Sequence, residues 1–551
     1  MLFTSPWPDV AIPDLPFSDF LFADVSSWAD RPAFIDGPSG RTLSHGQVHA
    51  LSRQVAGALA QRGLRKGDVF AIVSPNLPEY AVAFHGVAMA GGVVTTASPL
   101  ASVDELVSQL TDSKARWLLT VPALIDNARA AAGRSQGNAR PPEVSLTPSG
   151  GGLGAARPWG RSQIEEIFVF GDAAGATSFA ELLRSDATLP EIAIDPANDL
   201  LCLPYSSGTT GRAKGVMLTH RNAVAMLSQL APLATDLTGR SAIAVLPFYH
   251  AYGMQIQMNG TLHRGTTTVT MPRWDLEQFL ALIQQYRITT LILVPPIVLA
   301  LARHPRVADF DLSSVEVIGS GAAPLGADLQ RAASERVAPV RQGYGMTETS
   351  VGVSGWPQDG AGMVDGAVGY LLPNVQARIV DVDSGADLEP GARGELLVRG
   401  PNVMRGYLNA REATDAMLDA EGWLHTGDVA RFDAQGRLFI VDRLKELIKV
   451  KGYQVAPAHL EALLLSHPAV ADAAVIGIPD DEAGERPKAF VVQRGEVSAQ
   501  ALIDHVATQV APYERLRAIE FIEAIPKSPS GKILRRMLRE RAALPSAGSK
   551  A

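Results

Sequence analysis

Cysteine is almost absent from this chain, since Cys202 is the one thiol among 551 residues. A single cysteine excludes an intrachain disulfide and any cysteine-rich metal site. Positive charge is also scarce: 49 Lys and Arg face 57 Asp and Glu, for a net charge of −8. That balance argues against nucleic acid as a general partner. Long apolar runs are missing as well. The most apolar stretch, 291–301, contains two prolines and is too short to span a bilayer.

The two ends of the sequence carry no recognisable targeting signal. Met1 to Pro8 lacks the basic segment and apolar core of a secretory signal. The final Ser549-Lys550-Ala551 differs from the peroxisomal Ser-Lys-Leu. We therefore expect a cytoplasmic protein without a membrane span. The remaining composition, 46% hydrophobic and 19% charged, is that of an ordinary globular protein, and the length suggests roughly two to four domains.

Alternating patterns dominate the first part of the chain. Short apolar runs typical of buried strands alternate with amphipathic stretches over about residues 40–330, which favours an α/β layered core with parallel strands. The clearest strand-like runs are 69–73, 116–120 and 166–170, and the clearest helical stretches are 105–110 and 276–286. Residues 133–163 interrupt this pattern. They are rich in Gly, Pro, Ser and Arg, and we interpret them as a disordered surface insertion.

The second part of the chain has a different pattern. Short strands at 376–380, 394–399 and 437–441 alternate with Gly and Pro turns and predict a small β-rich subdomain. The charged segment that follows is a candidate domain boundary. We predict an N-terminal domain over 1–441, a hinge at 442–445 and an α+β C-terminal domain over 446–551, with a disordered tail from about Ala542.

The stretch 205–215 reads Tyr-Ser-Ser-Gly-Thr-Thr-Gly-Arg-Ala-Lys-Gly. Glycine lets the backbone approach a ligand closely, successive N–H groups in such a turn bind anions, and Lys214 adds a point charge. An apolar run, 200–203, precedes the loop, and a helix can start near His220 behind it. Strand, glycine loop and helix form the context of a phosphate loop. We predict a polyphosphate site; a flexible Ser/Gly linker is the alternative.

Two further segments place ligand-type side chains in glycine turns. In 342–349, Tyr344 stands between two glycines, and Glu348 offers the hard oxygen that the Mg²⁺ of a nucleotide triphosphate needs. In 422–428, Asp428 follows a glycine turn and can accept hydrogen bonds from both ribose hydroxyls. Taken singly, an ordinary turn with a solvated Glu and an Asx turn explain the same residues.

Two more segments present lysines. Residues 442–454 alternate lysines with apolar residues before a turn at Gly452, which indicates a ligand-facing hairpin or, alternatively, a solvated charged face. Residues 526–536 fix a loop with two prolines and a glycine, and this loop presents Lys532. A basic tail ahead of a helix is the plainer interpretation of the second segment.

Together these segments identify the chain by resemblance. It is similar to the adenylate-forming acyl-CoA synthetases, the superfamily that includes beetle luciferase and peptide-synthetase adenylation domains, and most similar to its 4-coumarate–CoA ligase branch. The resemblance extends from about residue 15 to 540. The matching segments are the loop 205–215 with 216–220, 344–348, 394–400 with 406–407, 445–449 and 530–532.

The resemblance implies a two-step reaction that uses ATP, Mg²⁺ and coenzyme A. A carboxylate first attacks the α-phosphorus of ATP, which gives an acyl-adenylate and pyrophosphate. The thiol of coenzyme A then attacks the acyl carbon and expels AMP. The first step brings two anions together, so positive charge and positioning dominate it. The resemblance also implies that the C-terminal domain rotates between the two steps about a hinge at Lys445.

The resemblance assigns roles to individual residues. The catalytic positions are Lys532, which stabilises the transition state of adenylation, Thr347, Lys449, Gln454 and His250. The phosphates are held by Ser206, Ser207, Gly208, Thr209, Thr210 and Lys214, and the Mg²⁺ by Glu348. The adenine is framed by Ala322, Gln342, Gly343 and Tyr344, and the ribose is held by Asp428 and Arg443. Coenzyme A is guided by Lys451 and Gly452, next to the hinge residue Lys445.

The acyl pocket is implied in the same way. An aromatic segment, 248–253, lines it in the family, and we assign Tyr252, Ile256, Gly321 and Val351 to it, with His250 as either a pocket residue or a core histidine. Residues 246–256 contain no Asp to bind an α-ammonium group, which favours an acid without an α-amino group.

Two departures from the family pattern are visible. The sequence Thr-Ser-Val-Gly at 349–352 replaces the Ala-Gly-Pro-Val common in plant coumarate ligases, which leaves the hydroxycinnamate open. Ala213 replaces the usual proline before the loop lysine, which chiefly affects the unfolded chain.

We therefore predict a ligase that converts a 4-coumarate- or cinnamate-like acid to its CoA thioester. A medium- or long-chain fatty acyl-CoA ligase and an acyl-AMP ligase that loads a separate carrier protein remain alternatives on the same fold. A non-catalytic nucleotide-binding protein is disfavoured because five functional residues occur together: Lys214, Glu348, Asp428, Arg443 and Lys532. We expect no nucleic acid partner, and the oligomeric state stays open.

Overall fold

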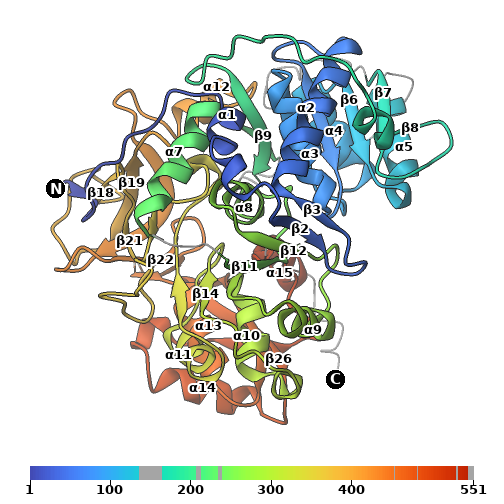
Figure 1. Ribbon diagram of the computed structural model, residues 1–551. Helices are drawn as coiled ribbons and strands as arrows, with labels where there is room; N and C mark the ends of the chain where they lie inside the picture. The colour runs from blue at the N-terminus through green and yellow to red at the C-terminus, as the bar shows by residue number, and fades with distance from the viewer. Residues whose placement is uncertain are drawn as a thin grey trace, which may run out of the picture.

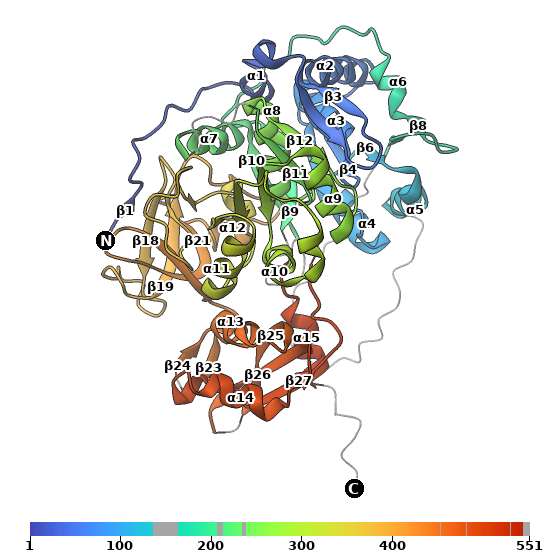
Figure 2. The ribbon, with the colours of Figure 1, turned by 60° about the horizontal axis from the view of Figure 1, so that its bottom comes forward.

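The computed structural model describes residues 1–135, 164–206, 213–233, 239–451, 453–480, 482–528 and 531–543. The predicted α/β class is confirmed. Sheets with helices on their faces form a large N-terminal body, and a smaller lobe of strands and helices lies against one side of it (Figures 1 and 2). Among the described helices, none is both long and apolar enough to cross a membrane.

The first sheet runs in the order β20-β10-β9-β5-β4-β6-β7-β8. Its central strands pair in parallel, as the apolar runs predict: β4 (Val69–Val73), β5 (Val93–Ala97), β6 (Trp117–Thr120) and β7 (Glu166–Val169). Towards the edges lie β8 (Thr177–Ser178), β9 (Leu200–Ser206), β10 (Lys214–Thr219) and β20 (Gly406–Tyr407). The predicted strand at Cys202 is β9, and the thiol is buried there.

The second sheet is parallel apart from one edge strand. Its order is β15-β14-β13-β11-β12-β2-β3, and β3 pairs antiparallel with β2. The strands are β15 (Val340–Gln342), β14 (Val317–Ser320), β13 (Thr290–Leu293), β11 (Ser241–Ala244), β12 (Thr267–Thr270), β2 (Pro32–Asp36) and β3 (Thr42–Ser44). The carboxyl ends of β14 and β15 lead into segments predicted to bind ligand, which fits the usual location of sites in such sheets.

Helices fill the space between and outside these sheets. α2 (His45–Gln61) packs on α3 (Pro78–Met89), which contacts both β5 and β2 and so joins the two sheets. α4 (Val103–Ser113) and α5 (Ile125–Ser135) cover the outer face of the first sheet, and α9 (Leu276–Tyr286), α10 (Pro295–Arg303) and α11 (Ala327–Arg336) pack with the second (Figure 1). Capping boxes start α2 at Ser44 and α4 at Ser102.

The predicted β-rich subdomain is a third sheet, in the order β1-β18-β19-β21-β22. Its strands are β1 (Phe3–Thr4), β18 (Gln376–Val380), β19 (Gly394–Arg399), β21 (Leu424–Phe432) and β22 (Leu438–Arg443). All pairings are antiparallel. The first residues of the chain thus close the edge of a sheet built from residues far along the sequence.

The C-terminal lobe has its own sheet and core. β25 (Val470–Asp480) and β26 (Gly484–Gln493) form its long hairpin, flanked by the hairpin of β23 (Ile448–Val450) and β24 (Tyr453–Val455) and by β27 (Ala518–Phe521). α13 (Pro457–Ser466), α14 (Ala499–Ala507) and α15 (Arg535–Ala543) cover it (Figure 2). The domain boundaries at 441 and 446 stay a prediction.

Two expectations differ from the structure. α5 continues through Ser135, so Gly133 and Arg134 are helical where the insertion was expected to have begun, and 136–163 lie outside the described residues. The glycine loop is followed by a strand that was not predicted, before the chain reaches the helix expected near His220, which is present. It connects β9 to the antiparallel β10, and α7 (His220–Leu230) starts only after β10, with Thr219 as its N-cap. Apolar Val216 and Leu218 pair into the sheet, and they belong to a strand instead of the start of a helix.

Candidate functional site

The centre of the site is the buried carboxylate of Asp428 on β21. The antiparallel pairing of β21 with β22 sets Asp428 opposite Arg443, and Arg443 Nε lies 2.9 Å from Asp428 Oδ1. The Tyr344 hydroxyl donates to Asp428 Oδ2 at 2.5 Å. Both oxygens are therefore held in place. Burial raises the pKa of Asp428, while Arg443 and Tyr344 act in the opposite direction.

Lys532 brings the charge of the C-terminal lobe to this centre. Burial and the nearby Arg443 lower the pKa of the Lys532 ammonium, and Asp428 opposes them. Burial is the main cause that lowers the pKa of His250 to about 4, and the charge of the Lys532 ammonium is the second. His250 is therefore neutral at physiological pH. Three segments far apart in the sequence meet here: 248–253, β21 with β22, and the loop before α15.

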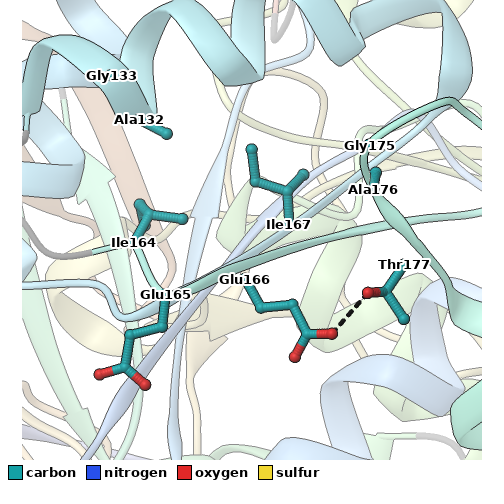
Figure 3. A pocket seen from close by; sticks show the side chains of 9 residues that line it. All are labelled: Ala132, Gly133, Ile164, Glu165, Glu166, Ile167, Gly175, Ala176 and Thr177. Atoms are coloured by element: carbon teal, nitrogen blue, oxygen red, sulfur yellow. Dashed lines mark hydrogen bonds between the residues drawn. The ribbon is translucent and has the colours of Figure 1, made fainter.

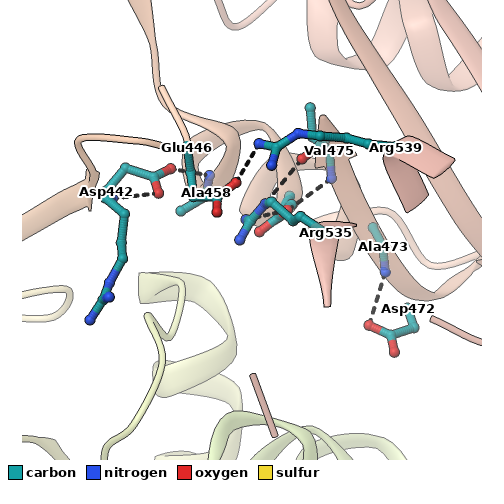
Figure 4. A network of polar contacts seen from close by, with 10 residues as sticks. Asp442, Glu446, Ala458, Asp472, Ala473, Val475, Arg535 and Arg539 are labelled. Carbon is teal, nitrogen blue, oxygen red and sulfur yellow. Dashed lines mark hydrogen bonds and ion pairs between the residues drawn. The ribbon is translucent and has the colours of Figure 1, made fainter. Parts of the chain in front are cut away.

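The loop that carries Lys532 is fixed from both sides. The Lys532 backbone N–H donates to Ser528 Oγ at 3.1 Å. Arg535 is pinned by Glu461 Oε1 at 2.7 Å and by the carbonyl of Val475 at 3.2 Å (Figure 4). Because Glu461 lies on α13 and Val475 on β25, the core of the lobe sets the position of Lys532.

The segment between the two bodies belongs to the same polar network. Asp442 Oδ1 accepts the Arg443 N–H at 2.7 Å, and Asp442 Oδ2 accepts the N–H of Ala458 at 2.8 Å. Arg539 on α15 pairs with Glu446 at 2.6 Å (Figure 4). The end of β22 is thus tied to the first helix and the last helix of the lobe.

Glu348 is a buried carboxylate, 6% exposed, held at one oxygen. Ser206 Oγ and the Tyr407 hydroxyl donate to Oε1 at 2.9 and 2.8 Å. No hydrogen bond from the described residues reaches Oε2. One carboxylate with a free oxygen beside a phosphate loop fits Mg²⁺, which takes one or two carboxylates together with substrate phosphates and water. Accordingly, the described residues include no cluster of three or more acidic, His or Cys side chains that resembles an all-protein metal cage.

The two ends of the phosphate loop lie next to Glu348. Ser206 ends β9 and Lys214 begins β10, and the two are register partners. Lys214 Nζ lies 5.4 Å from the centre of the Tyr407 ring. The intervening candidates lie outside the described residues: Ser207, Gly208, Thr209 and Thr210.

The predicted adenine frame lies at the ends of β14 and β15. The Gly343 N–H donates to the Ser320 carbonyl at 3.0 Å, and Ala322 adopts a left-handed backbone with φ 69°. The Gln342 side chain forms hydrogen bonds to other protein groups and so supports the local structure. Its amide accepts from the Leu325 N–H and donates to the Leu325 carbonyl and to Gln330. Gln342 thus holds the loop after β14 in shape.

Among the acyl-pocket candidates, Tyr252 lies against Gly321. A Cβ at Gly321 would lie 3.1 Å from the ring of Tyr252, and Tyr252 N–H donates to His250 Nδ1 at 3.3 Å. Ile256 lies on a π-helix, η4 (Gly253–Asn259), an irregular element that often occurs at functional sites.

A tightly wound turn carries two more candidates, Thr347 and Val351. Thr347 begins the short helix η6 (Thr347–Thr349), and Val351 follows with φ 106°. A Cβ at Gly345 would lie 1.4 Å from the Val351 carbonyl oxygen, so only glycine fits there.

Comparison with known proteins agrees with this geometry. The family model of the AMP-binding enzyme matches residues 21–408, and that of the AMP-binding enzyme C-terminal domain matches residues 459–532. The chain belongs to the AMP-binding enzyme family.

Two curated relatives of this AMP-binding enzyme cover nearly its whole length. It is 41% identical to 4-coumarate–CoA ligase 5 of Oryza sativa subsp. japonica over 98% of this chain and 97% of the relative. It is 40% identical to a 4-coumarate–CoA ligase of Pinus taeda, with 98% of each chain covered. Among solved structures, an anthranilate CoA ligase in complex with anthranoyl-AMP superposes with a TM-score of 0.84 at 25% identity, covering 96% of this chain and 99% of that one.

Some candidates lie apart from the centre of this AMP-binding site. Lys449 and Gln454 are exposed register partners on the hairpin of β23 and β24, with Lys451 at its turn and Gly452 outside the described residues. Figure 2 shows β23 and β24 at the opposite edge of the lobe from α15, the helix that follows Lys532. In this arrangement, the hairpin lies away from α15 and from the loop that precedes it. Lys445 lies between β22 and β23.

Two contributors to the AMP-binding site carry no role in the sequence-based assignment. Tyr407 holds Glu348, and Glu461 holds Arg535. Tyr407 belongs to the short segment 406–407 that resembles the family, so the sequence alone could have indicated a role for it. Glu461 sits in an unremarkable helix, and only its burial identifies it.

A separate pocket lies on the far side of the first sheet. Ile164, Glu166 and Ile167 of the β7 region line it with Ala132 and Thr177, and Thr177 donates to Glu166 at 2.6 Å (Figure 3). It adjoins the ends of the 136–163 segment and contains none of the predicted site residues.

Proposed function

We propose that the protein is an ATP-dependent acid–thiol ligase that converts an aromatic, 4-coumarate- or cinnamate-like acid to its CoA thioester. The observation that carries the proposal is the ion pair of Asp428 with Arg443, together with Lys532 near enough for its charge to act on Asp428. Lys532 brings a positive charge from the C-terminal lobe, which we propose to be mobile. Asp428 offers a carboxylate that can bind the ribose hydroxyls. The curated relatives named 4-coumarate–CoA ligase give the acid class.

In the first step, a carboxylate oxygen of the acid bonds to the α-phosphorus of ATP. The bond from that phosphorus to the bridging oxygen of the β-phosphate breaks, and pyrophosphate leaves. Lys532 lowers the barrier by stabilising negative charge on the α-phosphate. Glu348 would hold the Mg²⁺, and Asp428 with Arg443 would hold the ribose. Lys214 would bind the leaving phosphates.

In the second step, the coenzyme A sulfur bonds to the acyl carbon, AMP leaves and the thiol proton passes to solvent. Lys449, Gln454 and Lys451 belong to the hairpin of β23 and β24, which lies at the opposite edge of the lobe from α15 (Figure 2). We propose that the lobe, residues 446–551, turns about the 442–445 segment and presents the hairpin for this step.

The test is pyrophosphate release with ATP and Mg²⁺ across cinnamic, benzoic and fatty acids, followed by mass spectrometry of the thioester. We expect cinnamate-like acids to give the highest kcat/KM and stoichiometric AMP and thioester with coenzyme A. Higher kcat/KM with fatty acids would instead establish the fatty acyl-CoA ligase. Transfer to an added carrier protein but not to coenzyme A would establish the carrier-loading ligase. Absence of pyrophosphate release with every acid would overturn adenylation itself.

The cytoplasm is the proposed compartment. A single, buried cysteine suits a reducing environment, and cell fractionation tests the proposal.

A further inference from the structure

α10 contacts the C-terminal lobe at both of its ends. At its start, Val294 and Pro296 lie directly beneath Gly531, the residue before Lys532. A Cβ at Gly531 would lie 3.2 Å from Val294 Cγ2 and 3.2 Å from Pro296 Cδ, and Gly531 has φ 80°. The backbone of the loop that carries Lys532 therefore packs against the start of α10. This close approach requires glycine at position 531.

At the other end of α10, Arg303 reaches across to the lobe. Its guanidinium donates to the carbonyl of Leu465, near the end of α13, and to the carbonyl of Val470 at 3.3 Å, where β25 begins. Carbonyls in the last turn of a helix lack intrahelical partners and carry partial negative charge. A carbonyl in the last turn of α13, that of Leu465, thus receives a hydrogen bond that the helix itself does not provide. The donor is Arg303, a residue of the N-terminal body.

Like charge opposes this contact. Burial and the neighbouring charge of Arg494 both lower the pKa of Arg303. Arg494 is an exposed residue of the lobe. The contact therefore depends on the carbonyl bonds and exists in spite of an adjacent cation, which suits a contact that must form and release.

The geometry explains why two contacts matter. α10 has nine residues and spans about 13 Å at 1.5 Å per residue. A lobe held at one end of that span can still pivot about the contact, whereas a lobe held at both ends cannot. The orientation of Lys532 toward Asp428 is therefore fixed by α10 as well as by the lobe's own core.

We propose that Arg303 is a positioning residue for adenylation: it latches the lobe in the orientation that keeps Lys532 in the site, and it releases when the lobe turns. This inference rests on the proposed two-step function. It assigns the latch to one half-reaction, because the bonds to Leu465 and Val470 exist in the arrangement that faces Lys532 inward.

The experiment measures the two half-reactions separately in Arg303→Gln. Adenylation is followed as acid-dependent pyrophosphate release, and thioester formation as the conversion of purified cinnamoyl-adenylate with coenzyme A. We expect adenylation to slow about tenfold, the usual effect of losing charge-assisted hydrogen bonds, while the second half-reaction keeps or gains rate. Arg303→Lys should restore part of the adenylation rate.

The matched control is Arg336→Gln. Arg336 donates to the His304 carbonyl at 2.9 Å, at the same end of α10, but both residues belong to the N-terminal body. Adenylation should therefore stay at the wild-type rate. Arg494→Glu is the variant of opposite sign, since it converts repulsion of Arg303 into attraction. We expect it to slow thioester formation and to leave adenylation intact.

Equal losses in both half-reactions of Arg303→Gln, or no loss in either, would overturn the latch. An Arg494→Glu variant that slows adenylation instead would also overturn it, even if Arg303→Gln folds poorly. If wild-type protein releases no pyrophosphate with any acid, the proposed function fails first, and the latch fails with it.

Discussion

At the scale of single residues, Lys532 has the most separable role. Its half-buried ammonium lies close enough to Arg443 and Asp428 for their charges to act on its pKa. We predict that Lys532→Ala slows adenylation about 10²- to 10³-fold, the usual effect of removing one electrostatic stabiliser. Conversion of pre-made acyl-adenylate to thioester should keep its rate, because we propose that the hairpin, and not Lys532, serves that step.

Lys527→Ala is the control for that substitution. Lys527 lies on the same loop but pairs with Asp472 at 2.6 Å within the lobe. Its loss should leave pyrophosphate release unchanged. The role assigned to Lys532 is wrong if the two half-reactions fall together in Lys532→Ala.

A second residue-scale prediction concerns acid stability. His85 is fully buried on α3, with Nε2 3.1 Å from Asn259 Oδ1, and burial lowers its pKa to about 3. The unfolded chain binds a proton at this residue near pH 6.5, but the folded chain does not. The free energy of unfolding must therefore fall as the pH drops from about 6.5 toward 3.

His85→Gln should flatten this fall by about 1.4 kcal/mol per pH unit between pH 6 and 4. Urea unfolding at a series of pH values measures the slope. His304→Gln, at an exposed histidine, is the comparison and should keep the wild-type slope. Parallel slopes for wild type and His85→Gln would mean that His85 is protonated in the folded protein.

At the scale of elements, patterns that depend on neighbours in sequence were read correctly. The helices α4 and α9 and the strands β4, β6 and β7 follow from such local signals. The strand β10 was missed because Val216 and Leu218 form too short a run to distinguish a strand from the approach to a helix. Its partner strands β9 and β20 decide the conformation, and tertiary pairing is not visible in the run itself.

The same distinction applies to the site. Asp428, Arg443 and Tyr344 were assigned through matching segments, and the structure brings them within hydrogen-bond distance. The supporting part of Gln342 could not be foreseen, because it depends on Leu325 and Gln330 meeting its amide in space. The roles of Asp428, Arg443 and Tyr344 toward substrates stay predictions.

An element-scale prediction follows for the loop after β14. Gly321 has no positive φ among the described outliers, so alanine fits its backbone, but the new Cβ would press on the Tyr252 ring at 3.1 Å. We predict that Gly321→Ala raises KM for the acid about tenfold, a cost typical of crowding in a packed pocket, with little change in KM for ATP. Steady-state kinetics with each substrate varied in turn measures the two constants.

Gly260→Ala on α8 (Gly260–Arg264) is the control, because its nearest neighbour, the Gln255 carbonyl, lies at an ordinary 3.4 Å. Both KM values should stay at the wild-type level in this variant. A rise in KM for ATP alone in Gly321→Ala would place Gly321 in the nucleotide site instead.

At the scale of the whole molecule, the relation between the lobes could not be predicted from sequence patterns. It depends on isolated residues, such as Arg303 and Gly326, that belong to no motif and touch partners more than a hundred positions away. Sequence indicates that a smaller C-terminal domain exists; packing decides which of its faces meets the N-terminal body.

That packing allows the lobe to be locked. A Cβ at Gly326, the N-cap of α11, would lie 3.1 Å from the Cβ of Ala462 on α13, close to the 3.5–4.5 Å of a disulfide. The native Cys202 is buried and does not compete.

We predict that oxidised Gly326→Cys/Ala462→Cys releases one burst of pyrophosphate stoichiometric with enzyme, because Lys532 stays in the site. Thioester formation should stop and return on reduction, since the hairpin of β23 and β24 cannot turn inward while the lobes are joined. Each single-cysteine variant, treated with the same oxidant, should turn over normally. Continued thioester formation by the cross-linked enzyme would show that both half-reactions proceed in the observed arrangement, and the proposed rotation would have to be abandoned.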